Sequence, residues 1–116
     1  GGTQLMTRRI GWSRAADLIF TARRIDAEEA LRLGLADRFV DDAKGEALAL
    51  ASTIAKHSPV GVRNAKAAMR GGLDVGLDEG LDLEDARWHD TAFSADRAEG
   101  VRAFAEKRTP EWPGLG

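Results

Sequence analysis

Start and stop signals for helices recur along the whole chain and leave little room for strands. Asp26 and Ser58 stand where helix N-caps are expected, and Pro59 follows Ser58 at the first helical position. The helix that begins at Asp26 is expected to end at Gly34, and the helix that begins at Ser58 is expected to end at Gly71-Gly72. Apolar residues recur between these signals at helical spacing. The pattern predicts helices that begin near residues 13, 26, 43, 58, 73 and 94.

The fold class that follows is mainly α, with five or six helices. Residues 35–40 are the one place where a short extended segment is expected, because they contain Phe and Val and follow a glycine. A length of 116 residues suits one domain, which we place at residues 1–108. Pro110 and Pro113 then end regular structure, and residues 109–116 are expected to form a short mobile tail.

Composition excludes several classes of function. There are 17 basic and 19 acidic residues, a net charge of −2, whereas a nucleic-acid-binding domain is usually clearly basic. The chain has no cysteine and two histidines, so we predict neither a metal site nor a cofactor. No apolar run is long enough to span a bilayer, so we predict no membrane partner and a soluble, cytoplasmic protein.

Acidic residues and one histidine follow one face of the helix expected over residues 73–92, namely Asp74, Asp78, Asp82, Asp85 and His89. Side chains at such spacings can bind metals in helical bundles. A di-metal bundle also needs matching Glu and His ligands on facing helices, and the sequence shows none. We therefore interpret these residues as a solvated acidic face.

Glu84 lies within the apolar stripe of the same helix, between Leu81 and Trp88. A carboxylate there is expected to be buried, and a buried charge needs a partner. It could act as a general acid or base with a raised pKa. Because no second acid, histidine or metal accompanies it, we favour a structural ion pair with an arginine and predict no catalytic residue in the chain.

The end of the last expected helix is the best binding candidate. Phe104, Lys107 and Arg108 fall within one turn or so, and an aromatic ring beside a cation suits a ligand that carries a ring and a phosphate. The alternative is a core Phe104, inward with Val101 and Ala105, beside two solvated cations. Spacing alone favours the alternative.

Several segments, taken together in order, resemble the enoyl-CoA hydratase/isomerase (crotonase) superfamily. Gly1-Gly2-Thr3-Gln4 is similar to its GGTQ segment, and residues 20–30 are similar to its L-T-G-R-x-I-x-A-x-E-A stretch, with Ala22 in place of the glycine. Residues 33–40, the Ser58-Pro59 pair with Lys66, and Leu81 with Glu84 match the segments that follow. Residues 99–108 match its closing E-G-x-x-A-F-x-E-K-R.

The resemblance implies a fold of two parts, an N-terminal ββα spiral and a helical C-terminal part, of which this chain resembles only the second. The family's two catalytic glutamates and its oxyanion hole lie upstream of the GGTQ segment and have no counterpart here. The chain also opens without Met, so we expect a piece of a longer enzyme that hydrates or isomerises enoyl-CoA in fatty-acid metabolism, inactive alone.

The resemblance further implies a role for this part. It would build trimer contacts, cover the acyl pocket and place Phe104 and Lys107 against coenzyme A, the group carried by an acyl-CoA or enoyl-CoA substrate. Self-association is therefore expected. The alternative is a stand-alone helical oligomerisation or binding module without catalysis.

Overall fold

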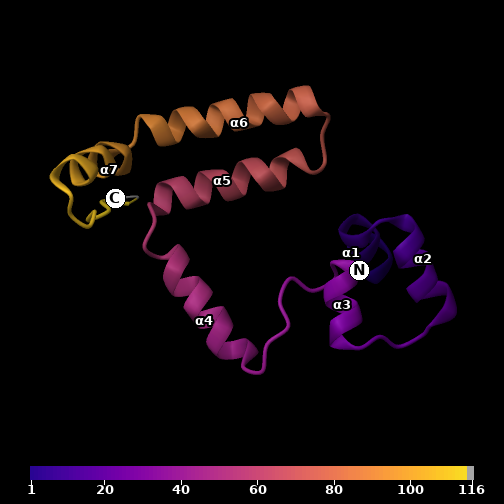
Figure 1. The fold of residues 1–116 in the computed structure, drawn as a ribbon. Helices are drawn as coiled ribbons and strands as arrows, with labels where there is room; N and C mark the ends of the chain where they lie inside the picture. The colour runs from indigo at the N-terminus through magenta and orange to yellow at the C-terminus, as the bar shows by residue number, and fades with distance from the viewer. Residues whose placement is uncertain (115–116) are drawn as a thin grey trace. The chain divides into compact units, whose positions relative to one another are not determined.

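The computed structural model describes residues 1–114, which contain helices and no strand (Figure 1). The seven helices are α1 (Gly2–Ile10), α2 (Trp12–Thr21), α3 (Ala27–Leu33), α4 (Ala43–Ile54), α5 (Pro59–Gly72), α6 (Leu77–Ala92) and α7 (Ala95–Glu106). The mainly α prediction is confirmed. The number of helices exceeds the predicted five or six because α1 was not predicted. No side chain caps its N-terminus, so the sequence carries no start signal for it. Residues 35–40 are irregular, so they add no strand.

Contacts between residues divide the chain into two compact units. The N-terminal unit comprises Gly1–Ala47 and the C-terminal unit begins at Leu48, so the division falls within α4. The single domain predicted over residues 1–108 stays a prediction.

The core of the N-terminal unit forms where α1 and α2 meet. Ile10, Ala15 and Leu18 are buried there, and half-buried apolar side chains close around them, namely Met6, Ile19, Ile25, Leu33 and Leu35. Three of these five come from α3 and the loops beside it, so burial of apolar surface joins all three helices.

Polar contacts fix the loops of this unit. The Asp26 carboxylate accepts a hydrogen bond from the Glu29 amide (2.8 Å), as an N-cap should, and Gly34 ends α3 at φ 80°. The Glu29 side chain does not return to Asp26 as a capping box would require. It accepts from Arg23 instead, and Arg23 also donates to Asp17, which joins α2 to α3. Arg23 above all lowers the pKa of Glu29.

In the C-terminal unit, α5 and α6 form an antiparallel hairpin (Figure 1). The helices pack closely where glycines face each other: a Cβ on Gly80 would lie 3.8 Å from the Gly72 Cα atom. The Asn64 amide donates to the Thr91 hydroxyl across the hairpin (2.9 Å). The face of α6 that meets α5 therefore carries Gly80 and Thr91, with the half-buried Leu83 between them.

Ala22 occupies a backbone conformation that favours glycine. It ends α2 in the left-handed region, at φ 50° and ψ 25°, where a Cβ atom crowds the backbone.

We expect Ala22→Gly to raise the free energy of unfolding of the N-terminal unit by about 0.5–1 kcal/mol. Relief of the left-handed strain outweighs the extra entropy that glycine gives the unfolded chain. Thermal melting followed by circular dichroism measures this. The matched control is Ala47→Gly, at an exposed site inside α4, which should destabilise by about 1 kcal/mol. Equal losses at both positions would contradict the interpretation.

Candidate functional site

Glu84 is exposed, so the prediction of a buried, paired carboxylate at this position is wrong. The reason is the rotation of α6. Gly80 and Thr91 face α5, whereas the stripe that contains Leu77, Leu81 and Trp88 lies beside that contact, and these three side chains are 78%, 52% and 65% exposed. Leu77, Leu81 and Glu84 line an open groove at the edge of the hairpin together with Met69 of α5. Glu84 has no ion-pair partner among residues 1–114.

The buried carboxylates lie on α7 instead, at Asp96 and Glu99, which are 1% and 2% exposed. Asp96 accepts three hydrogen bonds, two from the start of α5 and one from the C-terminal segment: the Ser58 hydroxyl at 2.5 Å, the Val60 amide at 3.3 Å and the Gly114 amide at 2.7 Å. The Val60 amide is one of the first amides of α5, which have no partner within their own helix. Asp96 therefore joins the start of α5, the start of α7 and the C-terminal segment.

Glu99 is the second such centre, one turn along α7. Arg108 donates to both of its oxygens, at 2.6 Å to Oε1 and 3.0 Å to Oε2, and Arg102 donates to Oε2. The Glu111 amide donates to Oε1 at 2.8 Å. Both carboxylates thus exchange hydration for charge-assisted hydrogen bonds, the arrangement that makes burial of a charge tolerable.

The same contacts set the ionisation of the two acids. Burial alone would raise the pKa of Asp96, but hydrogen bonds from Ser58, Gly114 and Val60 outweigh it and the pKa is lowered. Arg108 foremost, with the Glu111 amide and Arg102, holds the pKa of Glu99 well below its usual range. Because their oxygens already accept several donors, neither acid is suited to act as a general base.

The inward face of α7 was predicted at Val101, Phe104 and Ala105, and this prediction is wrong. Asp96, Glu99 and Ala103 are the buried residues of α7. Polar side chains occupy a helix face that hydrophobic periodicity assigns to solvent, so apolar spacing could not find them. The one sequence signal for Glu99 was its place in the E-G-x-x-A-F-x-E-K-R segment of residues 99–108, which resembles the family's closing segment.

Phe104 and Lys107 end α7 on the exposed side. Phe104 is 87% exposed, and its ring lines an apolar pocket of about 340 Å³ together with Arg97, Val101 and Trp112. Lys107 lies one turn away, since its amide donates to the Phe104 carbonyl at 3.2 Å. Lys107 is exposed and is the second non-glycine residue in the left-handed region, at φ 55°. An aromatic ring and a cation are therefore available to a ligand at this end of the helix.

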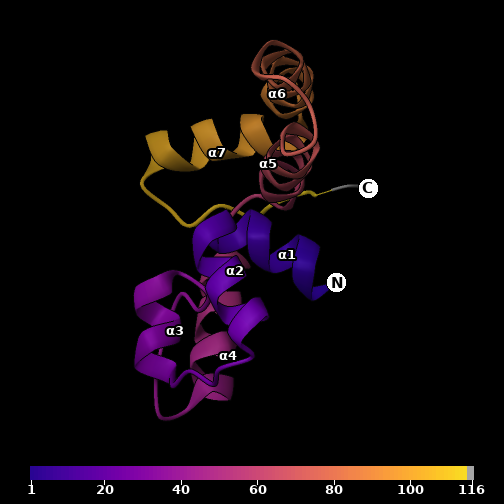
Figure 2. The ribbon, with the colours of Figure 1, turned by 90° about the vertical axis from the view of Figure 1, so that its right-hand side faces the viewer.

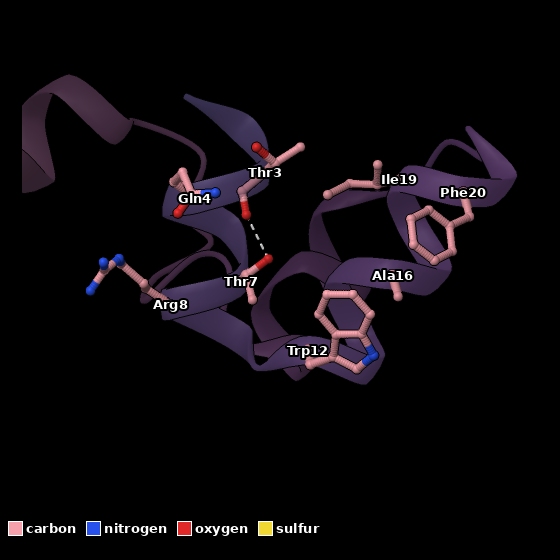
Figure 3. A pocket seen from close by; sticks show the side chains of 8 residues that line it. All are labelled: Thr3, Gln4, Thr7, Arg8, Trp12, Ala16, Ile19 and Phe20. Atoms are coloured by element: carbon pink, nitrogen blue, oxygen red, sulfur yellow. Dashed lines mark hydrogen bonds between the residues drawn. The ribbon is translucent and has the colours of Figure 1, made fainter.

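A second pocket, of about 360 Å³, lies within the N-terminal unit between α1 and α2 (Figure 3). Thr3 and Thr7 form its α1 side and are joined by a hydrogen bond from the Thr7 hydroxyl to the Thr3 carbonyl (2.6 Å). Trp12 and Phe20 line the α2 side and meet edge to face, with ring centroids 6.3 Å apart. Gln4 and Arg8 of α1 also line it (Figure 3). No acid or histidine lines it, so it offers shape and apolar surface and no proton-transfer group.

Residues 1–114 show neither a metal-binding cluster nor a membrane-spanning helix. The acidic residues of α6 and His89 do not gather into a group of three or more that could bind a metal ion, and His89 packs against Phe93 instead, with ring centroids 4.5 Å apart. None of the helices in this part of the chain combines the length and apolar character needed to cross a membrane.

These features define a class: an all-helical region with carboxylates buried as structural centres and an aromatic-cation end on its last helix. Comparison with known proteins makes this specific. A sequence model of the enoyl-CoA hydratase/isomerase family matches residues 1–114. The chain therefore belongs to the enoyl-CoA hydratase/isomerase family.

Individual relatives agree. A probable enoyl-CoA hydratase of Mycobacterium leprae is 46% identical over 114 residues, which cover 97% of this chain and 44% of the relative. The mitochondrial methylglutaconyl-CoA hydratase of Mus musculus is 42% identical over 120 residues, covering 98% and 38%. The crystal structure of enoyl-CoA hydratase from Bacillus anthracis superposes with a TM-score of 0.93 at 42% identity, covering 99% of this chain and 45% of that one. The chain thus spans less than half the length of the relatives it matches.

We expect the C-terminal unit to lose stability in acid. The pKa values of Asp96 and Glu99 are lower in the fold than in the unfolded chain, so their contribution is complete above the ordinary carboxyl pKa of about 4. It is lost as the pH falls from there through the lower values of the fold. Thermal melts between pH 7 and pH 3 should show this decline.

At pH 7, Asp96→Ala should lower the free energy of unfolding by about 3 kcal/mol, because three donors lose their acceptor. Glu84→Ala is the matched control and should change it by less than about 0.5 kcal/mol, since Glu84 is exposed. Similar effects of the two variants would contradict the assignment of the buried centre.

Proposed function

We propose that this chain is the helical C-terminal part of an enoyl-CoA hydratase/isomerase family enzyme that acts on acyl-CoA thioesters. The observation that carries the proposal is the family match over residues 1–114 in a chain that spans less than half the length of its relatives. The enzyme would hydrate or isomerise enoyl-CoA in fatty-acid metabolism, in the cytoplasm. The thioester is its substrate, and no separate cofactor is proposed.

The contribution of this part to substrate binding is contact with coenzyme A through Phe104 and Lys107. Coenzyme A carries an aromatic base and phosphates, and an exposed ring beside an exposed cation complements both. The geometry of α7 supports this. Phe104 is 87% exposed, which excludes the alternative that it is a core residue. Lys107 retains a left-handed backbone without being glycine, and such strain is common among residues that serve a site.

Catalysis is proposed to need residues outside this chain. Addition of water to an enoyl thioester requires donors that stabilise the developing oxyanion and a positioned acid–base pair. The two buried carboxylates, Asp96 and Glu99, are saturated with structural hydrogen bonds and therefore do not meet this need. We expect the chain by itself to be inactive.

Self-association is the third part of the proposal. Beside the exposed stripe of α6, made of Leu77, Leu81 and Trp88, Met69 lines the same groove as Leu77 and Leu81 and is 74% exposed, and Leu73 is 76% exposed. Contiguous exposed apolar surface favours association. The same stripe would serve the second candidate function, a stand-alone helical oligomerisation module, which would self-associate without binding coenzyme A.

Binding of coenzyme A tests the proposal. In calorimetric titrations of the chain, we expect Phe104→Ala and Lys107→Gly each to weaken coenzyme A binding by about tenfold, the loss that accompanies about 1.4 kcal/mol. Lys107→Gly is informative because glycine suits the left-handed site, so the cation is removed without strain. Lys44→Gly, at an exposed lysine on α4, is the matched control and should bind as the parent does.

Two outcomes would decide against the proposal. If the parent and both α7 variants bound coenzyme A with equal affinity, Phe104 and Lys107 would not belong to the binding site. Hydration of crotonyl-CoA by the purified chain, above the uncatalysed rate, would show that it carries its own catalytic groups.

Light scattering coupled to size exclusion tests self-association. We expect a mass well above the monomer value of 12.5 kDa at tens of micromolar protein. The double variant Leu77→Lys, Leu81→Lys should shift the mass toward the monomer, because both side chains belong to the exposed stripe. A monomeric parent would refute the assignment of this stripe to an interface.

A further inference from the structure

Residues 109–114, after the last helix, double back along α7 toward the start of α5 (Figure 2). We propose that these residues form a strap that opens and closes on α7 as a unit, while the helices stay folded, and that only the closed strap completes the apolar pocket beside Phe104. The proposal goes beyond the proposed function and does not depend on the identity of the ligand.

The strap is held at three polar points. The Glu111 amide donates to Glu99 at 2.8 Å and the Gly114 amide donates to Asp96 at 2.7 Å. The Trp112 indole N–H donates to the Lys56 carbonyl at 2.9 Å, just beyond the end of α4, where carbonyls lack helical partners. Arg108, at the root of the strap, adds two charge-assisted bonds to Glu99.

Each acceptor is a side-chain carboxylate or a carbonyl beyond a helix. Release of the strap therefore breaks no backbone hydrogen bond inside α5, α6 or α7. The side chains of Glu111 and Pro113 are exposed already, so the half-buried Pro110 and Trp112 are the apolar groups that release would uncover. Segments with few buried apolar contacts open at lower free energy than the whole unit, which makes an independent opening of the strap physically reasonable.

Gly100 provides the seat for Trp112. A Cβ atom at position 100 would lie 3.3 Å from one carbon of the indole ring and 3.4 Å from another, so the ring packs directly on the α7 backbone. Seated there, Trp112 lines the pocket of about 340 Å³ that Phe104 and Val101 also line. With the strap open, this wall is removed, and Phe104 is left on a convex helix surface. Asp96 and Glu99 thereby act as positioning residues for a pocket.

The experiment follows Trp112 fluorescence in a Trp12→Phe, Trp88→Phe background. Both replaced side chains are largely exposed, so the background should fold as the parent does. In this background, Glu99→Gln should raise the acrylamide quenching of Trp112 by about twofold. It should also speed hydrogen exchange at the amides of Glu111 and Gly114 by about tenfold, with no change at the amides of α5 and α6.

Glu106→Gln is the matched control. Glu106 also accepts from Arg108 (2.5 Å), but it is exposed and holds no strap amide, so both readouts should stay at the parent values. Unchanged quenching in Glu99→Gln would overturn the proposal. Exchange of the strap amides at the same rate as the most protected amides of α5 would also overturn it, because the strap would then open only on global unfolding.

A second variant keeps the test decisive where Glu99→Gln does not fold. Gly100→Leu leaves both carboxylates in place and favours the helix, but its side chain takes the space of the indole, because a Cβ atom alone would already lie 3.3 Å from the ring. We expect increased Trp112 quenching with full helical circular dichroism. Quenching equal to that of the parent would show that Trp112 does not depend on its seat, which would overturn the proposal.

Discussion

The hydrogen bonds to the Asp96 carboxylate are the interaction on which the C-terminal unit depends. One side chain, 1% exposed, accepts from the α4–α5 turn, from the first turn of α5 and from the C-terminal segment. No apolar contact could link the start of α5 and the C-terminal segment to α7 so specifically, because apolar burial has no direction while each donor here must point at an oxygen. Glu99 repeats the arrangement one turn later, so α7 organises the unit through charge.

This construction explains why the unit has so few buried apolar side chains. Among its apolar residues up to position 114, Val60 and Ala103 are the two that are buried, whereas Leu73, Leu77 and Met69 are largely exposed. An apolar surface of that extent is expected where further protein packs.

Local signals in the sequence predicted the helices well, and long-range signals were missing. Asp26 and Ser58 cap helices as their positions indicate, since a cap is read from a few neighbouring residues. The stripe on α6 was real, but periodicity cannot say which face meets a partner, so Glu84 was placed inside and is exposed. The acids that are buried look like surface residues by composition, and only the fold brings Ser58 and Gly114 to Asp96. Phe104 and Lys107 were found from their spacing and from the resemblance.

The double role of Ser58 restricts what evolution can place there. Its hydroxyl oxygen accepts from the Gly61 amide at 2.9 Å while its hydrogen is donated to Asp96. Serine, threonine, aspartate and asparagine are usually interchangeable as helix caps. Here aspartate would bring a second negative charge against Asp96, and only a hydroxyl both accepts and donates through one atom. Position 58 therefore tolerates only serine or threonine, although several residue types would suit an ordinary helix cap. Substitution at residue 58 thus depends on the identity of residue 96, thirty-eight positions away.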